Sequence, residues 1–221
     1  MFDALKEKIE ALFIDKKEVE IIPFDDPIAH NIDWKPLEKG GSSFRTHELR
    51  LIGYNRIEVM ATMNTKLLTS LFILAGIGMI GFYLYSNLFM RSNAEDDQPW
   101  MMLLMGALFF GGGAIALIKT FIKRIFDKEA GYFWKGNRNP QQLNEFAPGD
   151  RFVSLSHIHA LQIIKEQVRT KNSSYPSYEL NLVLKDLRRI NVMDHSKLNK
   201  LREDADTLAA FLNVPIWDVV P

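Results

Sequence analysis

The hydrophobic pattern of the chain is dominated by two long apolar blocks. No charged residue occurs between Leu67 and Met90, or between Trp100 and Ile118. A helix needs about 20 apolar residues to cross the roughly 30 Å hydrocarbon core of a bilayer, so the pattern predicts transmembrane helices at 67–90 and 100–118. Two buried helices of a water-soluble core are the alternative, but uncharged runs of this length are uncommon there. We therefore expect two membrane spans.

The chain before the first block predicts a helix and an arm. In residues 1–20 the apolar side chains recur at helical spacing, which predicts an amphipathic helix that packs on the protein, a membrane surface or a partner; they are Phe2, Leu5, Ile9, Leu12 and Phe13. Residues 21–46 combine scattered prolines and glycines with aromatic side chains. That combination argues against both regular structure and disorder, so we expect an extended arm laid over a surface.

Alternating patterns on both sides of the blocks predict strands. Residues 47–62 alternate apolar and polar side chains around Gly53, which predicts a β-hairpin that leads into the first span. After the second span we expect strands at 131–135, 151–156, 158–169, 178–185 and 188–195, and a closing helix at 197–212. Leu180, Leu182 and Leu184 form the clearest strand face. Asp186-Leu187 is a poor tight turn, because neither residue adopts positive φ cheaply.

The order of these elements resembles a pleckstrin-homology-like (PH-like) barrel, with seven strands and a C-terminal helix. The expected fold is an α+β membrane protein in which a two-helix transmembrane hairpin is inserted in a PH-like seven-stranded β-barrel or sheet, with a cytosolic domain at 124–221. Three strings, W-x-P…GG-x-x-F-x-TH (34–47), ELNLVL (179–184) and LAAFLNVPIWD (208–218), resemble an uncharacterised family of bacterial two-span membrane proteins. This resemblance implies topology and no activity.

Charge on either side of the spans predicts their orientation. The loop at 91–99 holds one arginine and three acidic residues, whereas the flanks beyond both spans are rich in lysine and arginine, which accumulate on the cytoplasmic side. Both termini are expected in the cytoplasm, the loop outside, and the protein in the cytoplasmic (inner) membrane. Neither block opens the chain, so we expect no cleaved signal peptide.

Composition and motifs exclude several classes of function. The 221 residues hold 27 basic and 27 acidic side chains, and this balance argues against a nucleic-acid partner, which needs a basic surplus. The chain contains no cysteine, which excludes thiol catalysis and disulfides. Phosphate-binding and hydrolase motifs do not occur. We therefore expect a protein that is not an enzyme and uses no cofactor.

Two histidines and a set of basic residues keep other functions open. His157 and His159 lie two apart in a predicted strand, so both rings would point the same way, as in metal-binding pairs, but no third ligand is identifiable. The lysines and arginines beside the spans favour contacts with anionic lipid. A lipid-acting or metal-dependent membrane enzyme and a lipid-headgroup sensor are thus the alternative functions.

Small residues in the spans lead to the main functional hypothesis. Gly106, Gly111, Gly112 and Gly113 let another helix approach closely. They either pack the two spans on each other or form a docking face for another membrane subunit or a second copy. With Trp34 of the arm as a second contact, the sequence favours a non-catalytic accessory or scaffolding subunit of a membrane protein complex.

The orientation is testable with single introduced cysteines, because the chain has no cysteine of its own that would react. A cysteine at Ser92 should react with a membrane-impermeant maleimide on intact cells. Cysteines at Ser173 and Ser196 should react only after the membrane is permeabilised, because both positions are expected in the cytoplasm. External labelling of a cysteine at Ser173 would show that the orientation is the opposite of the predicted one.

Overall fold

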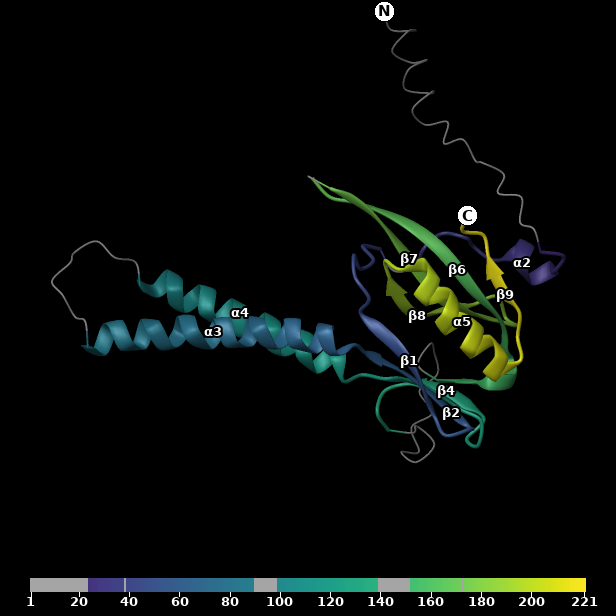
Figure 1. The fold of residues 1–221 in the computed structure, drawn as a ribbon, viewed down its shortest axis with the longest axis horizontal. Helices are drawn as coiled ribbons and strands as arrows, with labels where there is room; N and C mark the ends of the chain where they lie inside the picture. Colours follow the sequence, from purple (N-terminus) through teal and green to yellow (C-terminus); the bar gives the residue numbers. More distant parts are fainter. Residues whose placement is uncertain (1–23, 38, 90–98, 139–151, 172) are drawn as a thin grey trace, which may run out of the picture.

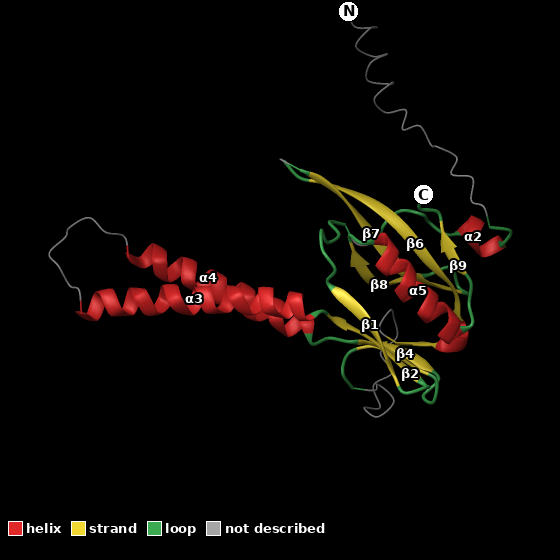
Figure 2. Ribbon diagram, in the orientation of Figure 1, coloured by secondary structure: helices red, strands yellow, loops and turns green. Residues whose placement is uncertain are grey.

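The computed structural model describes residues 24–37, 39–89, 99–138, 152–171 and 173–221. The helix predicted at 1–20 and all but the last residue of the loop predicted at 91–99 lie outside the described residues. Within them, the chain forms a mixed α+β domain of two sheets, from which a pair of long helices projects (Figures 1 and 2).

The first sheet carries the helix pair as an insertion between neighbouring strands. Its order is β1-β2-β3-β4-β5, antiparallel throughout. In chain order the elements are β1 (His47–Ile52), β2 (Arg56–Ala61), α3 (Met63–Phe89), α4 (Pro99–Thr120), β3 (Arg124–Asp127), β4 (Tyr132–Lys135) and β5 (Phe152–Ser154). The hairpin predicted at 47–62 is confirmed. Gly53 has φ of +65° in its turn, a conformation that glycine adopts without steric cost.

The second sheet has the order β8-β7-β6-β9, in which only β6 and β9 pair in parallel. Its elements are a short 3-10 turn η2 (Leu155–His157), β6 (Ile158–Arg169), β7 (Ser174–Leu184), β8 (Arg189–His195), α5 (Leu198–Leu212) and β9 (Ile216–Asp218). Helix α5 ends where Asn213 adopts the left-handed conformation, a common C-terminal signal. Pro215 follows it.

The main core lies between the two sheets and is closed by α5. It combines buried side chains of β2, β3, β6, β7, β8 and α5 in one cluster. Leu180, Leu182 and Leu184 are fully buried on one face of β7, as their alternation predicts. The apolar face of α5, including Leu201, Ala205 and Leu208, packs into the same cluster.

Of the predicted seven-stranded barrel or sheet, the described residues form sheets and no closed barrel. The described residues contain nine strands in two separate sheets. Strand β3 was absent from the sequence prediction, and so was β9. They span only four and three residues. At the β1 and β8 edges the sheets are joined by side chains and not by a strand ladder.

Asp186 and Leu187 do not form a two-residue turn by themselves, because the turn between β7 and β8 also includes Lys185. Leu187 has φ of +69°. Leu184 and Arg188 close the turn with a backbone hydrogen bond of 2.9 Å. The Asp186 carboxylate also accepts from the backbone N–H and side chain of Arg188. Pairing of two long strands therefore overrides the local cost of the turn, which is about 1–2 kcal/mol.

A common core predicts that damage to either sheet destabilises one cooperative unit. Ile57 of β2 and Leu182 of β7 are both fully buried in it. Ile57→Ala and Leu182→Ala should each lower the free energy of unfolding by about 2–5 kcal/mol. Circular dichroism of the purified full chain should show one earlier transition in both variants, with little change for the exposed control Leu51→Ala. Separate transitions for the two sheets would contradict a shared core.

Candidate functional site at the foot of the helix pair

Helices α3 and α4 pack on each other through three glycines. A Cβ atom at Gly76 would lie 2.5 Å from the backbone nitrogen of Phe110, and one at Gly106 would lie 2.8 Å from Ile80. Gly113 is similarly closed by Ile73, at 3.0 Å. Any larger residue at these positions would push the helices apart, so Gly106 and Gly113 serve the packing of the two helices on each other.

The other two glycines singled out by the sequence lie outside the close contact between α3 and α4. No atom lies within 4 Å of a Cβ built on Gly111 or Gly112. The four glycines of α4 are therefore not one surface, because helical rotation separates neighbours by about 100°. Gly106 and Gly113 lie at the helix–helix contact, and Gly111 and Gly112 lie outside it.

Both helices are long and apolar enough to cross a membrane. In their most apolar windows only 6% and 11% of the residues are buried within the protein. Large side chains around the pair are exposed, including Leu71, Leu74, Phe82, Leu108 and Ile115. The two helices therefore do not form the core of the α+β domain, which was the alternative interpretation of the apolar blocks.

The helix pair is tied to the domain without a flexible linker. Helix α3 begins two residues after β2 ends. Thr62, between them, donates its backbone N–H to Thr46 O at 2.9 Å, and Thr65 in the first turn donates its hydroxyl to the same oxygen at 3.1 Å. The position of α3 is thereby fixed relative to the start of β1.

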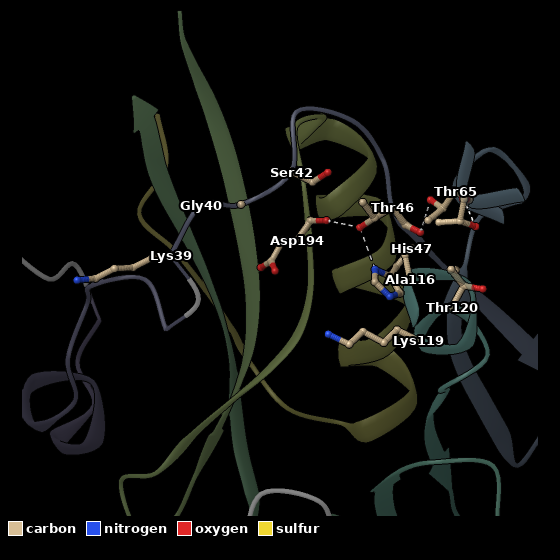
Figure 3. Close-up of a pocket in the computed structure, with 13 residues that line it drawn as sticks. Lys39, Gly40, Ser42, Thr46, His47, Thr65, Ala116, Lys119, Thr120 and Asp194 are labelled. Atoms are coloured by element: carbon tan, nitrogen blue, oxygen red, sulfur yellow. Dashed lines mark hydrogen bonds between the residues drawn. The ribbon is translucent and has the colours of Figure 1, made fainter. Parts of the chain in front are cut away.

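A pocket of about 480 Å³, lined mainly by polar residues, lies where the two helices join the domain (Figure 3). We call it the junction pocket. The arm, β1, both helices and β8 all contribute to its wall; the lining residues are Lys39, Gly40, Gly41, Ser42, Thr46, His47, Ala61, Thr65, Thr69, Ala116, Lys119, Thr120 and Asp194. In Figure 3 the Lys119 side chain extends from the end of α4 into the pocket, whereas that of Lys39 points away from the helices.

An apolar groove of about 420 Å³ runs along the two helices. We call it the helix groove. Its walls are almost wholly hydrophobic; the lining residues are Leu68, Thr69, Phe72, Leu108, Phe109, Gly112, Gly113 and Ala116. Thr69 and Ala116 line both this groove and the junction pocket, so the two spaces adjoin.

A chain of hydrogen bonds behind the junction pocket links the two sheets. Arg124 Nη1 lies 3.1 Å from His47 Nε2, and arginine can only donate, so Nε2 accepts and the ring is neutral. His47 Nδ1 then donates to the Thr46 hydroxyl at 2.9 Å, which donates to Asp194 O at 2.9 Å. The chain connects β3, β1 and β8, where no strand ladder joins the sheets.

Two histidines, His195 buried and His47 half-buried, are kept neutral at this corner. Burial lowers the pKa of His47 to about 4, helped by the nearby charge of Arg124. Burial likewise lowers the pKa of His195 to about 4, with Arg45 and Lys197 adding repulsion. Lys197 N donates to His195 Nδ1, so the neutral ring carries its proton on Nε2, which is buried without a hydrogen-bond partner in the described residues.

The arm is held on the outer face of the second sheet by two carboxylates. Glu179 on β7 accepts the backbone N–H of Leu37, with bonds of 3.0 and 2.9 Å. Glu166 on β6 accepts from the N–H groups of Gly40 and Gly41, each at 3.0 Å. The backbone N–H groups of Gly40 and Gly41 thus bind the Glu166 carboxylate of the same chain. A Cβ on Gly41 would lie 2.3 Å from Ser177 Oγ, so close approach of the arm requires glycine here.

Trp34 packs within this chain. Its ring stacks on Phe24 at 5.8 Å and lies 6.4 Å from Trp217 of β9, and its Nε1 donates to Ala29 O at 2.9 Å. A short helix, α2 (Pro27–Asn31), carries Ala29 into the same cluster. Trp34 therefore helps to attach the arm, and its role as a partner anchor stays a prediction.

The two histidines proposed as a metal-binding pair lie in different elements. His157 lies in the η2 turn and not in the expected strand, and its Nε2 is 3.4 Å from Asp186. His159 lies in β6, and its Nε2 is 2.7 Å from Asp26 of the arm. Within the described residues, no group of three or more histidine, cysteine, aspartate or glutamate side chains is arranged to hold a metal ion. Each ring instead pairs with its own carboxylate.

Sequence reasoning missed the junction pocket. Thr46, His47 and Asp194 carry no motif, and their proximity depends on contacts between β1 and β8, which are far apart in the sequence. The basic residues beside the second span are also divided: Lys123 pairs with Glu58 of β2 at 2.7 Å, while Lys119 lines the pocket.

The neutral histidines predict a loss of stability in mild acid. Folding lowers the pKa of both histidines from 6.5 to about 4. The two neutral rings therefore contribute to the stability of the folded state above about pH 6.5, and this stability is lost as the pH falls toward 4. By pH 5 the loss should be about 2 kcal/mol per ring. His47→Gln keeps an acceptor for Arg124 but does not titrate, so its melting temperature should fall less between pH 7 and pH 5 than that of the wild type. An unchanged pH dependence in this variant would show that His47 is not a source of the acid sensitivity.

Comparisons of the chain with protein-family models, with curated proteins and with solved structures find no match. The resemblance to the PH-like fold and to a bacterial two-span family therefore stays a prediction, and no relative identifies an activity for this chain.

Proposed function

We propose that this chain is a non-catalytic accessory or scaffolding subunit that resides in the cytoplasmic membrane and holds its α+β domain at a fixed position on the membrane surface. The observation that carries the proposal is the short, hydrogen-bonded connection between the helix pair and the domain. Neighbouring strands β2 and β3 continue into α3 and α4 almost without linkers, and Thr46 binds both Thr62 and Thr65.

Exposure of the helices supports the membrane placement. Exposed apolar side chains occur along α3 from Met63 to Phe89 and along α4 from Trp100 to Ile118. In water such a surface would drive aggregation, whereas in a bilayer it is solvated by lipid. The only charged residues in the two helices are Lys66 and Lys119, and both lie at the end next to the domain, as a cytoplasmic domain requires.

The outer face of α4 is the proposed contact with another membrane subunit or with a second copy of the chain. Gly111 lies outside the close contact between α3 and α4 and has open space in the direction of its missing Cβ. Small residues allow close helix contacts in lipid, where packing and not hydrophobic burial drives association. Because Gly76, Gly106 and Gly113 already serve the internal contact, Gly111 is available for an external one.

The partner proposal can be tested with matched glycine variants. Full-length wild type, Gly111→Leu and Gly78→Leu would be purified in mild detergent and compared by mass and by identification of co-purifying proteins. Both substitutions fill open space, so folding should be preserved. We expect Gly111→Leu to release the partner or break the homo-oligomer, while Gly78→Leu on α3 leaves it intact.

Three outcomes decide this proposal. Selective loss of the partner in Gly111→Leu supports it. A wild-type protein that is monomeric and purifies alone overturns it. Equal behaviour of both variants and wild type overturns the assignment of the contact to α4.

A further inference from the structure

The junction pocket and the helix groove adjoin each other and differ in the residues that line them. Thr69 of α3 and Ala116 of α4 belong to the walls of both spaces. On one side of these two residues the lining includes polar groups, namely several hydroxyl groups, Lys119 and Asp194. On the other side it is apolar as far as Leu108. The change from polar to apolar lining occurs within one helical turn of the charged end of α4.

The apolar part is an open groove along the two helices, long enough to hold part of a hydrocarbon chain. From Ala116 to Leu108 it follows about two turns of α4, or roughly 12 Å. Gly112 lines the middle of the groove and leaves open space where a side chain would stand. The aromatic rings of Phe72 and Phe109, which stack at 5.7 Å, also line it.

Three charged residues line the polar part, Lys39, Lys119 and Asp194, and of these the Lys39 side chain points away from the helices (Figure 3). The exposed side chain of Lys119 projects into the pocket from the last turn of α4, and within the described residues it forms no ion pair. Asp194 lines the same pocket from β8, where Asn191 Nδ2 donates to its carboxylate at 2.8 Å. A cation and a carboxylate in one pocket complement a zwitterion, and they do not favour a purely anionic group.

We propose that these two adjoining spaces bind one phospholipid with a primary-amine head group, taken from the surrounding bilayer. One acyl chain lies in the helix groove, the phosphate binds Lys119, and the ammonium group reaches Asp194. Thr46 and Thr65, whose hydroxyl oxygens can still accept hydrogen bonds, line the head-group space. This inference rests on the membrane placement proposed above but not on the existence of a protein partner.

A specifically bound lipid would also explain why a polar pocket sits beside an apolar groove. Lys119 marks the end of the uncharged stretch of α4, so in a membrane the phosphate layer and this ammonium group lie at the same depth. A head group between α4 and β8 would contact both the helix pair and the second sheet. Lipid binding would then strengthen the link between membrane helices and domain at the corner where no strand ladder exists.

Native mass spectrometry of the detergent-purified full chain tests this proposal. Dioleoyl phosphatidylethanolamine and dioleoyl phosphatidylglycerol would be titrated separately, because they share acyl chains and differ in head group. We expect one tightly retained phosphatidylethanolamine per chain. Loss of a charge-assisted contact typically weakens binding by about tenfold or more, so Lys119→Gln should lower the affinity for both lipids. Asp194→Asn should lower only the affinity for phosphatidylethanolamine, abolishing the preference.

Neighbouring glycines provide the matched control for the acyl chain. Gly112→Phe fills the groove, whereas Gly111→Phe places the same side chain on another face of α4; both directions are open, so both variants should fold. Retention of the lipid should fall at least about tenfold in Gly112→Phe and stay within about twofold in Gly111→Phe. Equal retention in these two variants would overturn the groove assignment, and equal affinity for the two lipids in the wild type would overturn the head-group assignment.

The two proposals fail independently of each other. If Gly111→Leu loses a protein partner and retains the lipid as the wild type does, the result supports the scaffold function and leaves the lipid site unaffected. Lipid loss in Gly112→Phe with the partner retained supports the lipid site alone. If the wild type retains no phospholipid at all, or retains several without any effect of Lys119→Gln, the two adjoining spaces are not a lipid site.

Discussion

Direct pairing of β2 with β3 is the constraint on which the rest of the structure depends. Neighbouring strands lie about 4.8 Å apart, whereas packed helices need 8–10 Å between their axes. Helices that are connected to adjacent strands must therefore move apart where they leave the sheet, and beyond that point they pack on each other. Gly76, Gly106 and Gly113 allow that packing by close backbone contact. Where the helices leave the sheet, the junction pocket and the adjoining groove are found.

A second consequence is the polar corner beneath the helices. The strands that carry α3 and α4 belong to one sheet, and the second sheet meets them at β1 and β8 through side chains. Arg124, His47 and Thr46 bridge that corner with a directional chain of hydrogen bonds. Such a chain works only with a neutral imidazole. The domain is consequently joined to its helices by short connections, and the hydrogen bonds at the corner between its sheets depend on the protonation state of His47.

The arm completes the domain from the opposite side. Its backbone N–H groups are bound by Glu166 and Glu179, and Trp34 covers Trp217 at the sheet surface. The arm then enters the junction pocket through Ser42 and Thr46. One continuous segment thus runs from the outer face of the second sheet to the foot of the helices. A ligand held in the pocket would contact the arm, the helices and β8 together, which is the physical basis for linking membrane contacts to the domain.

The sequence by itself determined the elements whose signals are local. Long uncharged runs specify the two helices, and strict alternation specifies β2 and β7, because burial on one face repeats with the period of the element. Gly53 marks its turn for a conformational reason that requires no partner. Only the tertiary structure decided which glycines of α4 face α3, that Leu187 adopts positive φ between two long paired strands, and that His157 and His159 bind separate carboxylates. It also brought His47, Lys119 and Asp194 to one pocket. Each of these depends on pairing between segments distant in the chain, and such pairing leaves no periodic trace in the sequence around any one of them.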